Sequence, residues 1–285
     1  MEIREIAANH LTFRCRLEGQ AGEPVVLLHG FPETSHMWCG LMPRLAESGF
    51  RCLAPDQRGY SPAARPDEIE AYAYRHLIAD VLALADAASF GRFHLVGHDW
   101  GALVGWGVLS TAPDRIASYV SLSIPHTLAF ARAVYEDPEE EPYRQILQAL
   151  LTEGVFEGLI HANDGAAIRA AYTHSPPEQI DEYIAVLSQP GAMKAAASWY
   201  RASRAHRRAL EDPDSPYGPV TTPSLLIWGA QDPYVRRMSV DLATEYMRGP
   251  YRIVELEAGH WLAQEQPGRV VDEVLAHVRA YPVGG

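Results

Sequence analysis

The hydrophobic residues of this chain gather in short runs, each separated from the next by a longer amphipathic or polar stretch. Two opening stretches, around residues 2–8 and 11–18, predict an antiparallel hairpin. Amphipathic segments such as 73–89 and 265–279 predict helices. Six apolar runs predict buried strands, at residues 24–30, 50–56, 93–99, 118–124, 224–230 and 251–257. This alternation predicts an α/β fold, in which a mainly parallel sheet carries helices on both faces.

The alternation stops between about residues 126 and 215, which are rich in Ala, Glu and Tyr and lack a convincing strand. This stretch includes the acidic run 136–142 and leaves through proline-rich sequence. Because it follows one predicted strand and precedes another, we expect a helical cap inserted above the sheet. The chain then forms one catalytic unit: a core from 1–125 and 216–285, and a cap insertion over 126–215.

Composition narrows the class of protein. The 285 residues are 47% hydrophobic, which is ample for a buried core. The formal net charge of −12 argues against nucleic acid or an anionic membrane as a partner. Cys15, Cys39 and Cys52 show neither close pairing nor metal-ligand spacing, as expected in a reducing cytosol. Without an apolar targeting segment or a run approaching roughly 20 apolar residues, a cytoplasmic location is favoured. Oligomeric state stays open.

Four motifs follow predicted strands, where active sites of parallel α/β sheets gather: HGFPE, GHDWG, WGAQD and GHW. In the second motif, Gly97 and Gly101 flank Asp99 on what we interpret as a tight strand-to-helix turn. A carboxylate at a helix N-terminus is favoured in its ionised form. The pentapeptide alone also fits a loop with a helix-capping aspartate. Its position after a strand, with chemical partners downstream, favours a nucleophile.

Those partners follow in the order nucleophile, acid, histidine. Asp232 comes just past the strand at 224–230, and His260 just past the strand at 251–257. The segment SLSIPH, which ends another predicted strand, offers no carboxylate, so Asp232 is the better orienting group. His98 stands beside the residue at the apex of the turn, and we interpret it as structural.

Taken together, the motifs resemble those of α/β-hydrolase-fold proteins of the epoxide hydrolase type, over nearly the full length. The motifs that carry this resemblance are HGFPETSHMW, PDQRGYS, GHDWG, SWYR, WGAQDPYV and GHWLAQEQP. The resemblance implies the α/β hydrolase fold, with an eight-stranded-type sheet and a cap, and an enzyme that needs neither metal nor organic cofactor.

An aspartate nucleophile changes the kind of bond that is attacked. A carboxylate can displace a leaving group from saturated carbon and form an alkyl ester on the enzyme. Asp99 therefore indicates an epoxide or an alkyl halide, and His260, oriented by Asp232, would activate the water that hydrolyses the ester. By analogy with the fold, the backbone N–H groups of Phe31 and Trp100 form the oxyanion hole.

The resemblance also implies tyrosine acids in the cap. GAMKAAASWYRA matches the family's second cap tyrosine and assigns Tyr200 as the acid. An ungapped comparison puts Ile146 where the first tyrosine is expected, and Tyr143 lies one helical turn earlier. We expect Tyr143, Trp199 and Trp261 to contact the small-molecule substrate.

The leading interpretation is a hydrolase that converts an epoxide to a vicinal diol. The first alternative is a haloalkane dehalogenase, in which Trp100 would bind the halide, but the usual asparagine donor of those enzymes is replaced here by Phe31. The second is a ligand-binding or slow-turnover member of the fold, disfavoured by the intact nucleophile, acid and histidine. A serine esterase is excluded because the chain has no G-x-S-x-G. Which epoxide is used stays open.

Overall fold

The computed structural model describes residues 1–158, 162–163 and 165–284, and within them one sheet runs in the order β1-β2-β4-β3-β5-β6-β7-β8. The strands are β1 (Glu2–Ala8), β2 (Leu11–Glu18), β3 (Glu23–Leu28), β4 (Phe50–Pro55), β5 (Phe93–His98), β6 (Ile116–Leu122), β7 (Ser224–Gly229) and β8 (Tyr251–Leu256). The expected opening hairpin and all six expected strands are present. The predicted fold class is confirmed.

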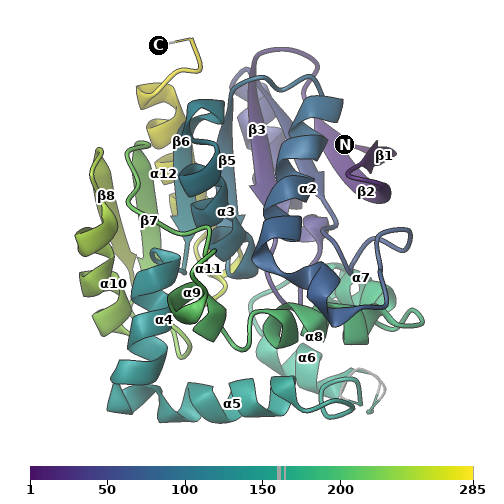
Figure 1. Cartoon of the computed structure of the whole chain (residues 1–285). Helices are drawn as coiled ribbons and strands as arrows, with labels where there is room; N and C mark the ends of the chain where they lie inside the picture. The colour runs from purple at the N-terminus through teal and green to yellow at the C-terminus, as the bar shows by residue number, and fades with distance from the viewer. Residues whose placement is uncertain (159–161, 164, 285) are drawn as a thin grey trace.

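Pairing is antiparallel between β1 and β2 and between β2 and β4, and parallel from β4 through to β8. Central strands are buried on both faces: every residue of β5, β6 and β7 is buried, as their continuous apolar runs require. Figure 1 shows α2 (Tyr74–Ala87) and α3 (Trp100–Thr111) in front of the sheet and α12 (Pro267–Ala280) behind it. The parallel strands therefore end together at one edge of a covered sheet.

Shorter helices complete the core. They are α1 (Met42–Glu47), α10 (Arg237–Ala243), α11 (Leu262–Glu265) and the 3-10 helices η1 (Ser35–Cys39), η2 (Ile69–Tyr72), η3 (Pro113–Arg115) and η5 (Thr244–Tyr246). In the described part of the chain, no helix combines the length and the apolar character needed to cross a membrane.

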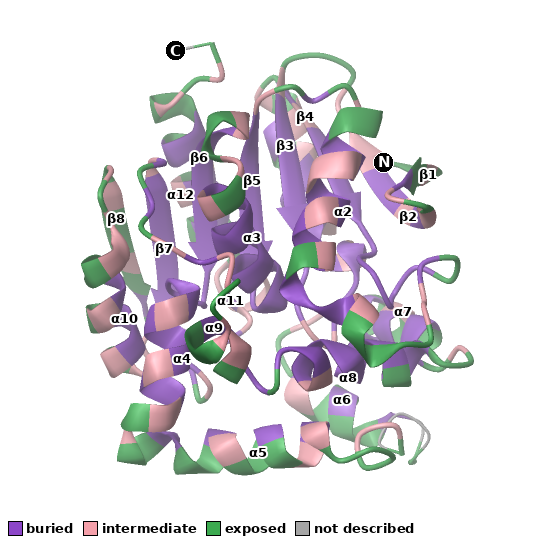
Figure 2. Cartoon of the chain, viewed as in Figure 1, coloured by how far each residue is buried: buried purple, intermediate pink, exposed green. Residues whose placement is uncertain are grey.

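Between β6 and β7 the described residues form helices and no strand, and we name the helical stretch, residues 127–211, the cap segment. Its helices are α4 (Thr127–Glu136), η4 (Pro138–Glu140), α5 (Glu141–Leu151), α6 (Ala166–Ala171), α7 (Pro177–Leu187), α8 (Ala192–Ala202) and α9 (Arg207–Glu211). Figure 1 shows α5, α6 and α8 below the edge at which the parallel strands end, and Figure 2 shows that the strands facing them are buried. The cap segment covers the edge where the candidate motifs lie.

Ion pairs fasten the cap segment to the sheet. Glu182 of α7 accepts hydrogen bonds of 2.9 Å from both Arg14 and Arg16 of β2. Arg14 also reaches the buried Asp56 at 2.6 Å. Because these carboxylates and guanidinium groups are largely removed from water, separating them would leave charges unpaired. The cap segment is thus held by defined polar contacts as well as by apolar packing.

Candidate active site

The site is built around Asp99, which stands between β5 and α3 with φ at +49°. The neighbouring glycines make this turn possible. A Cβ on Gly101 would lie 2.2 Å from the carbonyl oxygen of Leu28, and one on Gly97 would lie 2.5 Å from that of Gly101. The backbone of Phe31 donates a hydrogen bond of 2.7 Å to Asp99 Oδ1. One carboxylate oxygen is thereby held, and the other is left for chemistry.

The surroundings of Asp99 favour its charged form. Burial by itself would raise the pKa of Asp99, but the hydrogen bond and charge of His260, with smaller contributions from the neighbouring His98 and the Phe31 N–H, outweigh burial and lower it. The N-terminus of α3 acts in the same direction. Asp99 is therefore an ionised carboxylate at neutral pH, available to attack carbon.

His260 and Asp232 complete the polar side of the site. His260 Nδ1 lies 2.8 Å from Asp232 Oδ2, and its Nε2 lies 3.7 Å from Asp99 Oδ2. The other oxygen of Asp232 accepts backbone hydrogen bonds of 2.8 Å from Tyr234 and 3.1 Å from Val235. Burial disfavours a charged imidazole, yet the two carboxylates raise the pKa of His260 to about 10. The resting site therefore contains an imidazolium between two carboxylates.

A serine that sequence analysis passed over belongs to this group. Ser123 follows β6, and its hydroxyl donates to Asp232 Oδ2 and lies 2.9 Å from His260 Nδ1. Its φ is +75°, a conformation that a non-glycine residue adopts at a cost. The carboxyl end of β6 offers no carboxylate, as expected, but it supplies the Ser123 hydroxyl, which helps to hold Asp232 in place. The sequence did contain a signal for this residue, because Ser123 is a polar residue at the end of a third predicted strand.

His98 points away from the cavity. Its Nδ1 lies 2.7 Å from the fully buried carboxylate of Glu33, and its Nε2 donates to the carbonyl oxygen of His260 at 3.0 Å. Gln264 donates to the second oxygen of Glu33 at 2.9 Å. These contacts fit the interpretation of His98 as structural, since they fix the loop that carries His260.

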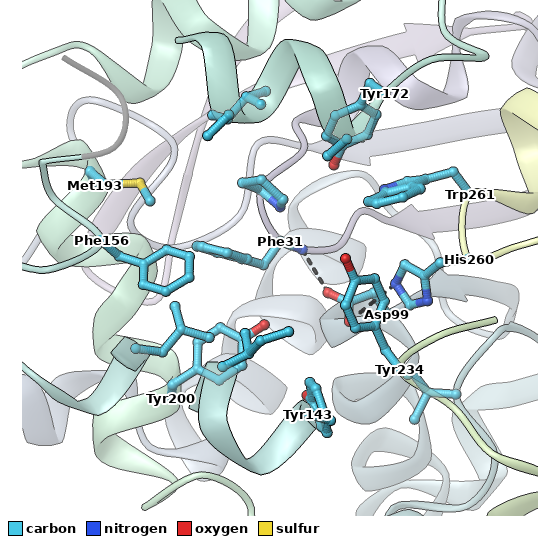
Figure 3. Close-up of a pocket in the computed structure, with 17 residues that line it drawn as sticks. Phe31, Asp99, Tyr143, Phe156, Tyr172, Met193, Tyr200, Tyr234, His260 and Trp261 are labelled. Carbon is cyan, nitrogen blue, oxygen red and sulfur yellow. Dashed lines mark hydrogen bonds and ion pairs between the residues drawn. The ribbon is translucent and has the colours of Figure 1, made fainter. Parts of the chain in front are cut away.

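A cavity of about 240 Å³ opens beside Asp99, between the sheet edge and the cap segment (Figure 3). Most of its surface is aromatic or aliphatic, and no Lys or Arg is among the described residues that line it. The lining residues are Phe31, Pro32, Asp99, Ile124, Tyr143, Ile146, Leu150, Phe156, Ala167, Ile168, Ala171, Tyr172, Met193, Tyr200, Tyr234, His260 and Trp261. A neutral apolar molecule fits this surface best.

Tyr200 and Tyr143 reach the cavity from the cap segment, with Asp99 facing them from the core (Figure 3). Tyr200 packs edge-on against Phe31 at 5.2 Å and against Trp100 at 4.9 Å between ring centres. Burial, and next the negative charge of Asp99, raise the pKa of both tyrosines well above the ordinary value. Both hydroxyls are therefore protonated at neutral pH. Ile146, one turn along α5, lines the same cavity.

The two tryptophans expected to contact substrate differ. Trp261 lines the cavity and packs against Tyr172 at 4.7 Å. Trp199 does not line it: its ring is buried beneath Trp100, and its indole N–H donates to the carbonyl oxygen of Arg58 at 2.9 Å. The expectation for Trp199 was wrong because the face of α8 that carries it packs on the core, whereas the next residue along faces the cavity.

Nothing in the described part of the chain groups three or more His, Cys, Asp or Glu side chains in a way that could hold a metal ion. The polar atoms that converge on the cavity are a carboxylate, an imidazole and hydroxyl groups. This set is suited to nucleophilic attack and proton transfer.

Comparison with known proteins decides the family. Residues 23–267 match the family model described as the alpha/beta hydrolase fold. The chain belongs to this α/β hydrolase family. It is 33% identical to epoxide hydrolase A of Mycobacterium tuberculosis, with 95% of each chain covered. It is 28% identical to epoxide hydrolase 4 of Mus musculus, over 94% of this chain and 77% of that protein. The crystal structure of epoxide hydrolase A from Mycobacterium thermoresistibile superposes with a TM-score of 0.82, at 30% identity and 99% coverage of both chains.

The expected resemblance and the expectation of a hydrolase are thus confirmed. This α/β hydrolase also contains a residue near its cavity that sequence analysis missed. His206 follows α8, is fully buried, and lies 3.4 Å through Nε2 from the Tyr143 hydroxyl. No strand end or family motif marked it, because its position depends on an unusual turn that only the three-dimensional structure reveals.

Proposed function

We propose that this α/β hydrolase converts an epoxide to a vicinal diol through a covalent ester on Asp99. The observation that carries the proposal is the position of the Asp99 carboxylate. Oδ1 accepts the Phe31 N–H at 2.7 Å, Oδ2 accepts no backbone N–H from the described residues, and Asp99 lines the cavity beneath the cap tyrosines. A carboxylate so placed attacks saturated carbon, where a serine would attack an acyl group.

In the first step, Asp99 Oδ2 attacks one ring carbon of the epoxide, and the carbon–oxygen bond on that side breaks. The electron pair of this bond goes to the epoxide oxygen, which takes a proton from the Tyr200 hydroxyl. General-acid catalysis of this kind contributes about 10²–10⁴-fold. The product of the step is a hydroxyalkyl ester of Asp99.

In the second step, water adds to the carbonyl carbon of the ester and loses a proton to His260. Forming the ester removes the negative charge of Asp99, one of the two carboxylates that raise the pKa of His260. Once the ester exists, the imidazolium is therefore more acidic, and its proton returns Tyr200 from the phenolate to the phenol. His260 is then the neutral base that accepts the proton of the water. The developing oxyanion forms on Oδ1, which already accepts the Phe31 N–H. Trp100 N–H is the proposed second donor. The intermediate expels the diol oxygen, which takes the proton back from His260. The Asp99 carboxyl group then gives its remaining proton to His260, which restores the carboxylate and the imidazolium.

The substrate is a neutral, mainly apolar epoxide. This follows from the aromatic and aliphatic lining, the absence of Lys or Arg among the described lining residues, and the negative charge of Asp99. The charge of the His260 imidazolium is already matched by Asp99 and Asp232, and no Lys or Arg is among the described lining residues, so an anionic substrate would be repelled. Its size of about 240 Å³ favours small aryl or short alkyl epoxides over long-chain ones.

A haloalkane dehalogenase remains the alternative to be tested. The position from which haloalkane dehalogenases usually supply an asparagine N–H to the halide is occupied here by Phe31. The side chain of Phe31 has no N–H. Alkyl bromides still belong in the assay, because the buried indole N–H groups of Trp100 and Trp261 have no hydrogen-bond partner in the described structure.

The experiment measures diol release from styrene oxide, its 4-carboxylate analogue and 1,2-epoxyhexane, and bromide release from 1-bromohexane. We expect turnover of both neutral epoxides, with kcat/KM for the carboxylate at least about tenfold lower. A single turnover in ¹⁸O water should give an unlabelled first diol, because its second oxygen comes from Asp99. A fully labelled first diol, or bromide release without diol formation, would overturn the proposal.

A further inference from the structure

The segment that follows α8 is strained. Arg204, Ala205 and His206 are consecutive residues with φ of +52°, +51° and +74°, and none of them is glycine. An L-residue with a Cβ is disfavoured in this left-handed region relative to ordinary backbone. The turn is held closed where the Ala205 N–H donates to the carbonyl oxygen of Tyr200 at 2.8 Å and the Tyr135 hydroxyl donates to that of Ala205 at 2.6 Å. A backbone maintained against such a cost is expected to serve a site.

The turn directs the His206 side chain inward. The imidazole is fully buried and packs against Trp100 at 5.2 Å and Phe130 at 5.3 Å between ring centres. Its Nδ1 lies 3.2 Å from the hydroxyl of Tyr74, on helix α2 of the core, and its Nε2 lies 3.4 Å from the hydroxyl of Tyr143, on helix α5 of the cap segment. His206 therefore joins a core tyrosine to a tyrosine that lines the cavity.

The protonation state of His206 limits which of the three groups, Tyr74, His206 and Tyr143, can donate each hydrogen bond. Burial lowers the pKa of His206 to about 4, so at neutral pH the ring carries one N–H and one acceptor nitrogen. In one of the two tautomers, the Tyr74 hydroxyl donates to Nδ1 and the Nε2–H donates to the Tyr143 oxygen. The proton of Tyr143 is then left for an acceptor in the cavity. Among the described residues, His206 is the one within hydrogen-bond distance of the Tyr143 hydroxyl.

We propose that His206 is a positioning residue that turns the Tyr143 hydroxyl toward the epoxide oxygen, so that Tyr143 acts beside Tyr200 when the ring opens. The inference rests on the proposed function. His206 gains and loses no proton in the step, since it only fixes the direction in which Tyr143 donates. The contact of 3.4 Å is long, as such contacts often are before a substrate is bound.

The test measures the rate of ester formation directly. The His260→Gln protein is mixed with styrene oxide, and the covalent adduct is followed by mass spectrometry over a single turnover. In this background, Tyr143→Phe and His206→Asn should each slow the reaction by about tenfold, the size expected for one buried hydrogen bond. Asn is chosen because it tolerates positive φ. The double variant should be no slower than Tyr143→Phe alone, since both changes remove the same donor.

A merely structural histidine would behave differently. Its loss would slow ester formation also in the absence of the Tyr143 hydroxyl, and it would slow ester formation from 1-bromohexane, whose leaving group needs no proton. Equal effects of His206→Asn in both Tyr143 backgrounds, or no effect in either, would overturn the inference. If His206→Asn does not fold, Tyr74→Phe takes its place and should slow the reaction only while the Tyr143 hydroxyl is present. Absence of any adduct in the His260→Gln protein itself would instead count against the proposed function.

Discussion

The two walls of the cavity are built in different ways. On the core wall, Asp99, Asp232 and His260 stand at the ends of three parallel strands and are joined by hydrogen bonds of 2.7–2.8 Å to a backbone N–H or to each other. On the cap wall, Tyr200 and Tyr143 are held mainly by aromatic packing, with one contact of 3.4 Å to His206. The side chains of the core wall are therefore positioned mainly by hydrogen bonds, and those of the cap wall mainly by packing.

This difference matches what each wall has to do under the proposed mechanism. The core wall must keep a carboxylate and an imidazole in register through two successive steps, and a sheet edge is a rigid support. The cap wall must deliver a proton to an oxygen that moves as the ring opens. The comparison therefore predicts that core substitutions abolish turnover and that cap substitutions slow one step selectively.

The largest effect is expected for Asp232→Asn. The backbone N–H groups of Tyr234 and Val235 donate to Oδ1, so the asparagine oxygen should remain there and its NH₂ should face His260. That arrangement fixes the wrong imidazole tautomer, a change that costs about 10⁴-fold in serine protease triads. We expect kcat to fall by a comparable factor in steady-state assays, with the Asp99 ester accumulating. Normal turnover in the folded variant would mean that Asp232 does not orient His260.

A smaller and more selective effect is expected for Tyr200→Phe. Loss of the acid should slow ester formation from epoxides by about 10²-fold or more. Ester formation from an alkyl bromide should be nearly unchanged, because bromide leaves without a proton. Single-turnover rates for the two substrates separate these outcomes. Tyr183→Phe is the matched control, since Tyr183 is a fully buried tyrosine of the cap segment that does not line the cavity. Equal losses for both substrates would argue for a packing defect.

Ser123 tests how far the core wall depends on hydrogen bonding. Ser123→Ala removes the hydroxyl shared by Asp232 and His260, and ester hydrolysis should slow by about tenfold. Ester formation should change little, since Asp99 does not contact this hydroxyl. Ser123→Gly should give the same kinetic loss while relieving the positive φ of +75°. If both variants hydrolyse the ester at the original rate, the serine serves only to fill space.

The smallest effect concerns the strained turn of the cap wall. Arg204 is exposed and has φ of +52°, so Arg204→Gly should raise the free energy of unfolding by about 1 kcal/mol and leave turnover unchanged. The control is Lys194→Gly at an exposed position inside α8, which should lower it by about 1 kcal/mol. Denaturant unfolding measures both. A destabilised Arg204→Gly protein would show that the turn is not strained.

The core wall could be predicted from the sequence because a general rule governs it. Carboxyl ends of parallel strands meet at one edge, so Asp99, Asp232 and His260 could be brought together from three predicted strands. Ser123 escaped this rule only because carboxylates were sought at the end of β6. The fold class followed from the same alternation of strands and helices.

The cap wall could be predicted only in part, because no comparable rule governs it. Tyr200 was named through a family motif, whereas Trp199, its neighbour on α8, was misplaced by the rotation of the helix. The inward position of the His206 side chain depends on three consecutive positive φ angles in a segment without glycine. No sequence pattern predicts such a turn. The contacts of His206 with Tyr74 of α2 and Tyr143 of α5 also depend on packing that is not local in sequence.

The most direct test of the central claim is the mass of the His260→Gln protein after incubation with styrene oxide, with the modified residue located by peptide sequencing. The account predicts a mass increase equal to the intact epoxide, because ring opening expels no group, and places it on Asp99. It also predicts that the further change Asp99→Asn abolishes the increase. An unmodified protein, or a modification on any other residue, would contradict an aspartate-linked ester as the intermediate.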